Sequence, residues 1–269
     1  MSFIDNYIVY TKFHSAPVIF NKWLAIAILS SILERSVYIH LGYRKIFPNL
    51  HVILVSDINR QIILQSISIA TNLMKVIDYP PKLILKTIKK KELVKLLSVK
   101  SLDEIDPYKC AVCSIHSACF SNNDDETKDL MQVLTDGYNN LLANLECSIT
   151  LTGYIHEAWI RQEASETARE IGFSETCNFI YSNDMNNVKE INISEINKMK
   201  IELVTQLNRI RILGGSVETI LPYNFSLDTA RKLAMICALA DEKLIIEDAH
   251  YNLAVQTLSE KMNGIMAWK

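Results

Sequence analysis

Four residues near the middle of the chain have side chains of the kinds that bind metal ions. Cys110, Cys113, His116 and Cys119 follow one another at intervals of three residues, and thiolate and imidazole are common ligands of zinc and of iron–sulfur clusters. The surrounding string, CAVCSIHSA, is also apolar enough for a buried strand, on which residues three apart point to opposite faces. Two interpretations stay open: a metal site if the segment is a loop, or small core residues if it is a strand.

Three groups of cations could contact the phosphates of a nucleic acid, because such contacts need little more than positive side chains on one face. Each group could equally be the solvated surface of a helix or turn, and no string typical of a base-reading module accompanies them. The groups are Arg44 and Lys45 in an expected turn, Lys86, Lys89, Lys90 and Lys91 in a basic run, and Arg209 and Arg211 on a late helix.

The composition excludes several classes of protein. Of the 269 residues, 49% are hydrophobic and 22% charged, with seven Gly and six Pro, which excludes collagen-like and intrinsically disordered chains. The formal net charge of −2 gives no general attraction to nucleic acid. The most apolar run, residues 24–33, is far shorter than the roughly 20 residues of a membrane-spanning helix, so we expect no membrane contact. Six Cys without a small-domain framework, and an N-terminus unlike a signal peptide, favour a cytoplasmic location.

Strand and helix patterns alternate through the middle of the chain. Short apolar runs, the first of them LHVILVS at residues 50–56, are typical of strands buried on both faces, and helical patterns separate them up to residue 182. This order predicts an α/β core with a mostly parallel sheet. We expect N-terminal helices and a lead-in strand at 1–48, the core at 49–186, and a C-terminal helical subdomain that forms a lid at 187–269.

Four strings follow one another along the chain at distinctive distances. They are VYIHLGYRKIFPNLHVILVS at 37–56, VLTDGYN at 133–139, ITLTGYIHEAWI at 149–160 and GFSETCNFIYS at 172–182. Their order and spacing resemble the P-loop ATPase domain, of the RecA-like (ASCE) class, in phage and mobile-element primase–helicase replication proteins. The resemblance implies a three-layer P-loop-NTPase-like core and assembly into rings, with the nucleotide bound between subunits.

The positions that bind and cleave nucleotide in that family carry other residue types here. A working phosphate loop reads GxxxxGK[ST], with a Lys for the phosphates and a hydroxyl for magnesium, whereas residues 56–63 read SDINRQII. Asp57 would repel phosphate, His116 stands where a Walker B carboxylate is expected, and Thr176 stands where the family has an Arg. The degenerate positions of the nucleotide site are Ser56, Asp57, Asn59, Arg60, Ile62, Ile63, His116 and Thr176.

These departures predict a protein without a catalytic residue or a cofactor, which neither binds nor cleaves a magnesium–nucleoside triphosphate. The resemblance then implies a non-catalytic, ATPase-like (pseudo-helicase) protein of a phage or mobile element. It would act in DNA replication or its control as a homo-oligomer, such as a ring, by contacting DNA, or by docking on an active helicase or primase. Two alternatives stay open: an antagonist or defence component that poisons a partner replication ATPase, and a Cys/His metal-binding protein.

Overall fold

The central feature of the structure is a sheet of five parallel strands. The computed structural model describes residues 1–42, 44–57, 60–84, 93, 109–116, 125–138, 147–155, 163–185, 188, 192–219 and 228–266. The strands are β3 (His51–Val55), β4 (Leu83–Ile84), β5 (Lys109–His116), β6 (Cys147–Ile155) and β7 (Cys177–Tyr181). Their order across the sheet is β4-β5-β6-β3-β7, with every pair parallel. The α/β class and the parallel sheet predicted from the apolar runs are therefore confirmed.

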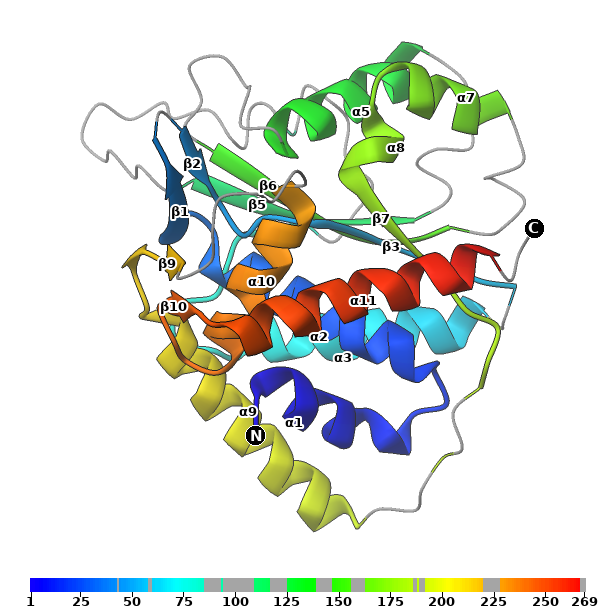
Figure 1. Ribbon diagram of the computed structural model, residues 1–269. Helices are drawn as coiled ribbons and strands as arrows, with labels where there is room; N and C mark the ends of the chain where they lie inside the picture. The colour runs from blue at the N-terminus through cyan, green and yellow to red at the C-terminus, as the bar shows by residue number, and fades with distance from the viewer. Residues whose placement is uncertain are drawn as a thin grey trace.

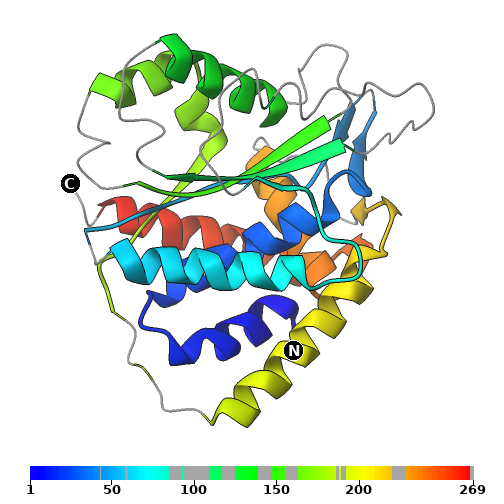
Figure 2. The same ribbon diagram turned by 180° about the vertical axis from the view of Figure 1, so that it is seen from behind.

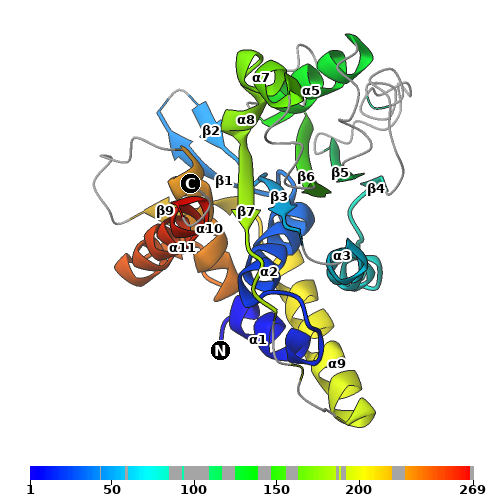
Figure 3. The same cartoon turned by 90° about the vertical axis from the view of Figure 1, so that its right-hand side faces the viewer.

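Helices lie on both faces of this sheet (Figures 1 and 2). On one face lie α2 (Val18–Leu33), α3 (Arg60–Lys75), α10 (Asp228–Ala240) and α11 (Asp248–Met266). On the other lie α5 (Asp125–Tyr138), α7 (Glu163–Glu170) and the short α8 (Phe173–Thr176). Beyond α2, on the side away from the sheet, lie α1 (Phe3–Tyr10), η1 (Thr11–Phe13) and α9 (Ile193–Arg211) (Figure 3). Because every residue of β3 is buried, this strand carries the continuous apolar run that two covered faces require.

Two small sheets join the N-terminal and C-terminal parts of the chain. β1 (Val37–Leu41) pairs with the antiparallel β2 (Arg44–Ile46) and with the parallel β8 (Gly215–Ser216). The second sheet contains β9 (Glu218–Thr219) and β10 (Ile245–Ile246). The sequence analysis did not predict β8 or β10, because two residues are too few to show a periodic pattern. The helix predicted at 89–99 lies outside the described residues except for Leu93.

A single hydrophobic core connects the helices from both ends of the chain. Trp23 and its neighbours on α2 are fully buried and pack with Leu207 of α9, Leu239 of α10 and Ala254 of α11, and Val52 of β3 belongs to the same cluster. The helix Val18–Leu33 lies in the part of the chain where N-terminal helices were expected. The C-terminal helices complete this core and do not form the separate lid that we expected, because their apolar faces cover α2 and the sheet.

Candidate functional site

The strand order places a topological switch point at the carboxyl end of β3. The helix that follows β3, α3, lies on one face of the sheet, whereas α7 and α8, which follow the neighbouring β6, lie on the other (Figure 3). In open α/β sheets, ligands bind in the crevice that opens where adjacent strands send their connections to opposite faces. The residues after β3 and β6 are therefore the first place to look for a site, and they include the string at 56–63 that the resemblance compares with a phosphate loop.

The loop after β3 is closed by contacts within the protein. The Oδ1 atom of Asn183, just after β7, accepts hydrogen bonds from the Ser56 hydroxyl at 2.8 Å and from the Asp57 backbone N–H at 3.1 Å. The Tyr154 hydroxyl of β6 donates to the Ser56 carbonyl oxygen at 3.2 Å, and the Ser182 N–H donates to the carbonyl oxygen of Val55 at 3.3 Å. A single amide oxygen thus accepts from two donors of the loop that follows β3.

The surroundings of Tyr154 keep its hydroxyl able to donate to this loop. Tyr154 is buried, and this burial raises its pKa, while Arg60 lowers it and Asp57 raises it. Asp57 and Arg60 are both exposed. The phenol therefore stays protonated, and its hydroxyl remains a hydrogen-bond donor to Ser56.

The first turn of α3 places apolar side chains where the family has its functional ones. Ile63, at the position of the magnesium-binding hydroxyl, is fully buried in the hydrophobic core, and Ile62, at the position of the Lys, is half-buried. Asn59 lies outside the described residues. This turn offers a triphosphate neither a cation nor a magnesium ligand from these two positions.

The metal-ligand candidates lie on the neighbouring strand. β5 contains Cys110, Cys113 and His116, so the strand interpretation of this segment is confirmed, and the alternation of faces along a strand applies to it. Cys119 lies outside the described residues. His116 pairs in register with Tyr154 at the carboxyl end of the sheet, near Ser56. Within the described ranges, no three His, Cys, Asp or Glu side chains gather as a metal ion would require.

Thr176 lies at the amino end of the sheet, the end opposite the loop that follows β3. It directly precedes β7, it is buried, and its hydroxyl donates to the carbonyl oxygen of Phe173 at 2.8 Å. Five residues of β7, a length of about 17 Å, separate it from Ser182 and the closed loop. The structure therefore does not bring Thr176 together with Ser56. The resemblance implies that the family's Arg at this position acts on the nucleotide site of a neighbouring subunit. Such a residue need not lie close to the loop of its own chain.

A buried polar cluster that the sequence analysis missed lies at the amino ends of β3 and β7. Lys232 of α10 donates from Nζ to the carbonyl oxygen of Asn49 at 3.0 Å and to its Oδ1 at 3.2 Å. Asn178 of β7 donates to the His51 carbonyl oxygen at 3.1 Å, and Lys261 of α11 donates to Asn178 Oδ1 at 3.0 Å. These contacts fix α10 and α11 against the ends of β3 and β7.

Burial dominates the titration of this cluster. Burial lowers the pKa of Lys232 to about 7; the nearby Asp228 acts to raise this pKa, and Arg44 acts to lower it. Burial also lowers the pKa of Lys261 to about 8, against a smaller opposite effect of Cys177. Burial and the nearby Lys232 lower the pKa of His51 to about 3. The imidazole is therefore neutral at neutral pH. In the sequence, His51 was visible only as one polar letter in an apolar run, and nothing near Lys232 marks it as buried.

The candidate nucleic-acid contacts on α9 are paired within the protein. Arg209 forms a two-bond ion pair with Glu242, at 2.7 and 2.8 Å. Arg211 lies 2.9 Å from Glu34 and donates to the carbonyl oxygen of Tyr79 at 3.3 Å. These two arginines attach α9 to neighbouring turns. The run Lys86, Lys89, Lys90 and Lys91 lies outside the described residues.

Arg44 and Lys45 lie on β2 and not in the expected turn. Arg44 forms an ion pair with Asp228 of α10 at 3.0 Å. Lys45 Nζ lies 4.1 Å from the centre of the Tyr38 ring. The two adjacent cations therefore have different surroundings.

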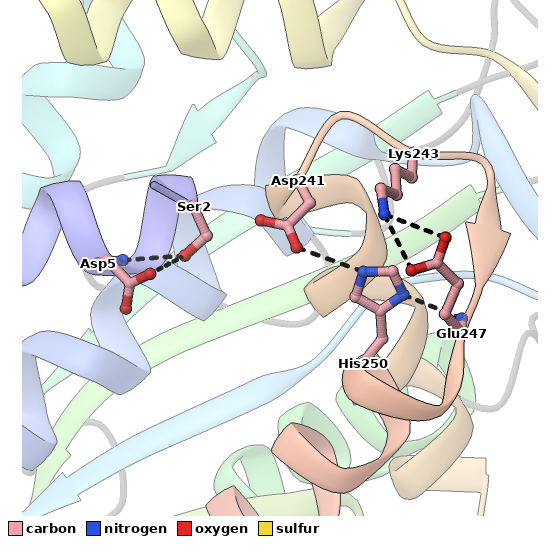
Figure 4. Close-up of polar contacts among 6 residues, drawn as sticks. All are labelled: Ser2, Asp5, Asp241, Lys243, Glu247 and His250. Atoms are coloured by element: carbon pink, nitrogen blue, oxygen red, sulfur yellow. Dashed lines mark hydrogen bonds and ion pairs between the residues drawn. The ribbon is translucent and has the colours of Figure 1, made fainter.

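A further group of charged residues at the turn between α10 and α11 has a structural role (Figure 4). His250 Nδ1 accepts from the Glu247 N–H at 3.0 Å, so Nε2 carries the proton and lies 3.3 Å from Asp241 Oδ2. At the start of α11 a side chain thus accepts from the backbone N–H of the cap residue, which is one half of a capping box. At the start of α1 the Ser2 hydroxyl instead accepts from the Asp5 N–H and donates to the Asp5 carboxylate. Lys243 pairs with Glu247 at 2.9 Å beside it. These contacts satisfy helix ends and leave no arrangement suited to a reaction.

No model of a known protein family matches the sequence, and no curated protein is significantly similar to it. Among the described helices, none is both long and apolar enough to cross a membrane.

Proposed function

We propose that this chain is a non-catalytic, ATPase-like (pseudo-helicase) protein of a phage or mobile element. It acts in DNA replication or its control, through self-assembly, DNA contact or docking on an active helicase or primase. The phage and replication setting comes from the resemblance of the sequence strings alone. The fold supports the ATPase-like body, as a three-layer core in which the strand–loop–helix unit β3–α3 has the frame of a phosphate loop. The parallel sheet also supports it, because β3 lies inside the sheet, between β6 and β7, with its loop at the topological switch point.

The observation that carries the proposal is the position of the Asn183 side chain. In a working phosphate loop, backbone N–H groups donate to phosphate oxygens, and the hydroxyl of the motif binds magnesium. Here the Asp57 N–H donates to Asn183 Oδ1, so an oxygen of the protein takes a backbone donor of this loop, and the Ser56 hydroxyl donates to the same atom. Such a loop is stable without nucleotide.

Isothermal titration of the full chain with magnesium–ATP and magnesium–ADP tests the closed loop. We expect no binding heat for the wild type. We also expect none for Asn183→Ala, because Asp57, Ile62 and Ile63 still provide no phosphate or magnesium ligand. ATP turnover that disappears on Arg60→Ala would refute the non-catalytic assignment. Light scattering after size exclusion, with and without ATP and single-stranded DNA, tests assembly, and a monomer under all conditions excludes self-assembly.

Asn183→Ala also gives a measurable stability change. Removing one acceptor leaves the buried Ser56 hydroxyl and the Asp57 N–H without it, which costs about 1–3 kcal/mol of unfolding free energy. Asn192→Ala is the matched control, since the donor to its Oδ1 among the described residues is the exposed Ser194 N–H. Urea unfolding should show the larger loss for Asn183→Ala, and equal losses would mean that the loop is not held by Asn183.

A further inference from the structure

Two cation–aromatic pairs lie on one face of the β1–β2 hairpin. The Arg35 guanidinium carbon lies 4.0 Å from the centre of the Phe47 ring, and Lys45 Nζ lies 4.1 Å from the centre of the Tyr38 ring. The Tyr38 and Phe47 rings meet edge to face, with centroids 6.1 Å apart. His40 is directly opposite Lys45 in the ladder, and both are exposed. The two rings thus lie next to each other with a cation against each, and Phe47 is the buried member of the group.

The strand register separates this outer face from an inner one. Residues directly opposite each other in an antiparallel pair lie on the same face, and successive residues alternate. Ile39 and Ile46 are opposite each other and buried, and the other inward pair is Leu41 with Arg44. The Arg44 ion pair with Asp228 therefore attaches the inner face of the hairpin to α10. Of the two adjacent cations, Lys45 is the one that faces outward.

The charge of the hairpin differs from that of the whole chain. Residues 35–56 contain no Asp or Glu, although the complete chain has a formal net charge of −2. A local positive surface of this kind attracts phosphates without making the whole protein basic. Unpaired bases stack on aromatic rings and on guanidinium planes.

We propose that the outer face of the β1–β2 hairpin, formed by Tyr38, His40 and Lys45 with the half-buried Arg35 beside them, binds single-stranded nucleic acid. The proposal rests on the proposed function only in that it names the surface responsible for DNA contact. Arg35 and Lys45 contact the phosphates, and the bases stack beside the half-buried Tyr38. Duplex DNA binds less tightly, because its bases are already stacked within the helix.

Fluorescence anisotropy of the full chain with a labelled 20-nucleotide dT strand tests this surface over a range of salt concentrations. We expect the double variant Arg35→Gln/Lys45→Gln to bind at least tenfold more weakly. Losing two phosphate contacts should also lower the salt dependence, the slope of log K against log salt, by about 1.4. Lys45→Glu is a second test at an exposed position that the fold tolerates. Arg209→Gln, an exposed cation on α9, is the matched control and should bind like the wild type.

Two competitors separate the classes of partner. An abasic strand of equal length should bind several-fold more weakly than dT, because it lacks bases to stack. Polyglutamate should compete poorly, and competition equal to dT per charge would point to an acidic protein and overturn the proposal. No binding by the wild type, or loss of binding by Arg209→Gln without loss by the hairpin variants, would also overturn it. None of these outcomes depends on ATP binding or on the oligomer, so the proposed function can stand or fail separately.

Discussion

The buried Lys232 should make the stability of the protein rise with pH above neutrality. Its side chain is 3% exposed, and its described hydrogen bonds go to the carbonyl oxygen and Oδ1 of Asn49, neither of which carries a charge. Burial lowers the pKa of Lys232 from 10.5 to about 7 in the folded chain. In the unfolded chain this lysine is solvated and keeps a pKa near its ordinary value.

The sign of the effect follows from where the proton is bound. Between pH 7 and 10.5 the unfolded chain holds a proton that the folded chain has released, so the free energy of unfolding rises with pH. Below pH 7 both states are protonated and this contribution stops changing. With these two pKa values, the contribution of Lys232 increases by about 2 kcal/mol between pH 7 and pH 9.

Lys232→Met removes the titrating group and keeps most of its length. Urea unfolding at pH 6, 7, 8 and 9, at constant ionic strength, should show that the wild type gains about 2 kcal/mol relative to Lys232→Met between pH 7 and 9. Lys198→Met, at an exposed position on α9, should follow the wild type. Parallel curves for the wild type and Lys232→Met would refute the reasoning, because they would mean that Lys232 titrates normally in the folded chain.

Two further predictions concern His51 and Glu242. The pKa of His51 is about 3 in the folded chain, so the unfolded chain takes up a proton below about pH 6.5 that the folded chain does not. The free energy of unfolding should therefore fall by about 2 kcal/mol between pH 7 and 5. Urea unfolding of His51→Leu over the same pH range should lack this loss. Glu242 ends α10 in a Schellman motif with φ of +59°, where Lys243 N–H bonds the Ala238 oxygen and the Glu242 N–H bonds the Leu239 oxygen. In an Arg209→Ala background, Glu242→Gly should therefore raise the unfolding free energy by about 1 kcal/mol in thermal or urea melts, and a loss would contradict a strained backbone at this residue.

The elements with strong periodic patterns were predictable, and those made by tertiary contacts were not. The apolar run at residues 50–56 predicted β3 because a strand covered on both faces needs no polar alternation. The two-residue β8 exists only because Gly215 and Ser216 lie beside β1, and no local pattern marks such a pairing. The expected lid was wrong for a related reason: the helical pattern of α10 and α11 shows an apolar face but not which surface it covers.

The contacts of the loop after β3 could not be read from the sequence. The string SDINRQII departs from the phosphate-loop motif, and this departure remains the basis of the prediction of an inert loop, while the structure adds that Ile63 is buried. Asn183 could not be identified, because it follows β7 in a polar stretch that we took for a boundary between parts of the chain. Its role depends on β7 being the spatial neighbour of β3, which is a property of the strand order.

A closed loop changes what the stability of this fold depends on. In a ligand-binding loop some donors must wait for the ligand, and each buried donor left unsatisfied costs about 1–3 kcal/mol until the ligand binds. The ligand then stabilises the protein in proportion to its concentration, so the folded state follows the supply of nucleotide. Here Asn183 satisfies the Ser56 hydroxyl and the Asp57 N–H permanently, and Tyr154 adds its bond to the Ser56 carbonyl oxygen. The midpoint of thermal unfolding should therefore be the same with and without millimolar ATP. That independence suits a body that keeps one shape while it assembles or docks, whereas a motor must change shape with its nucleotide.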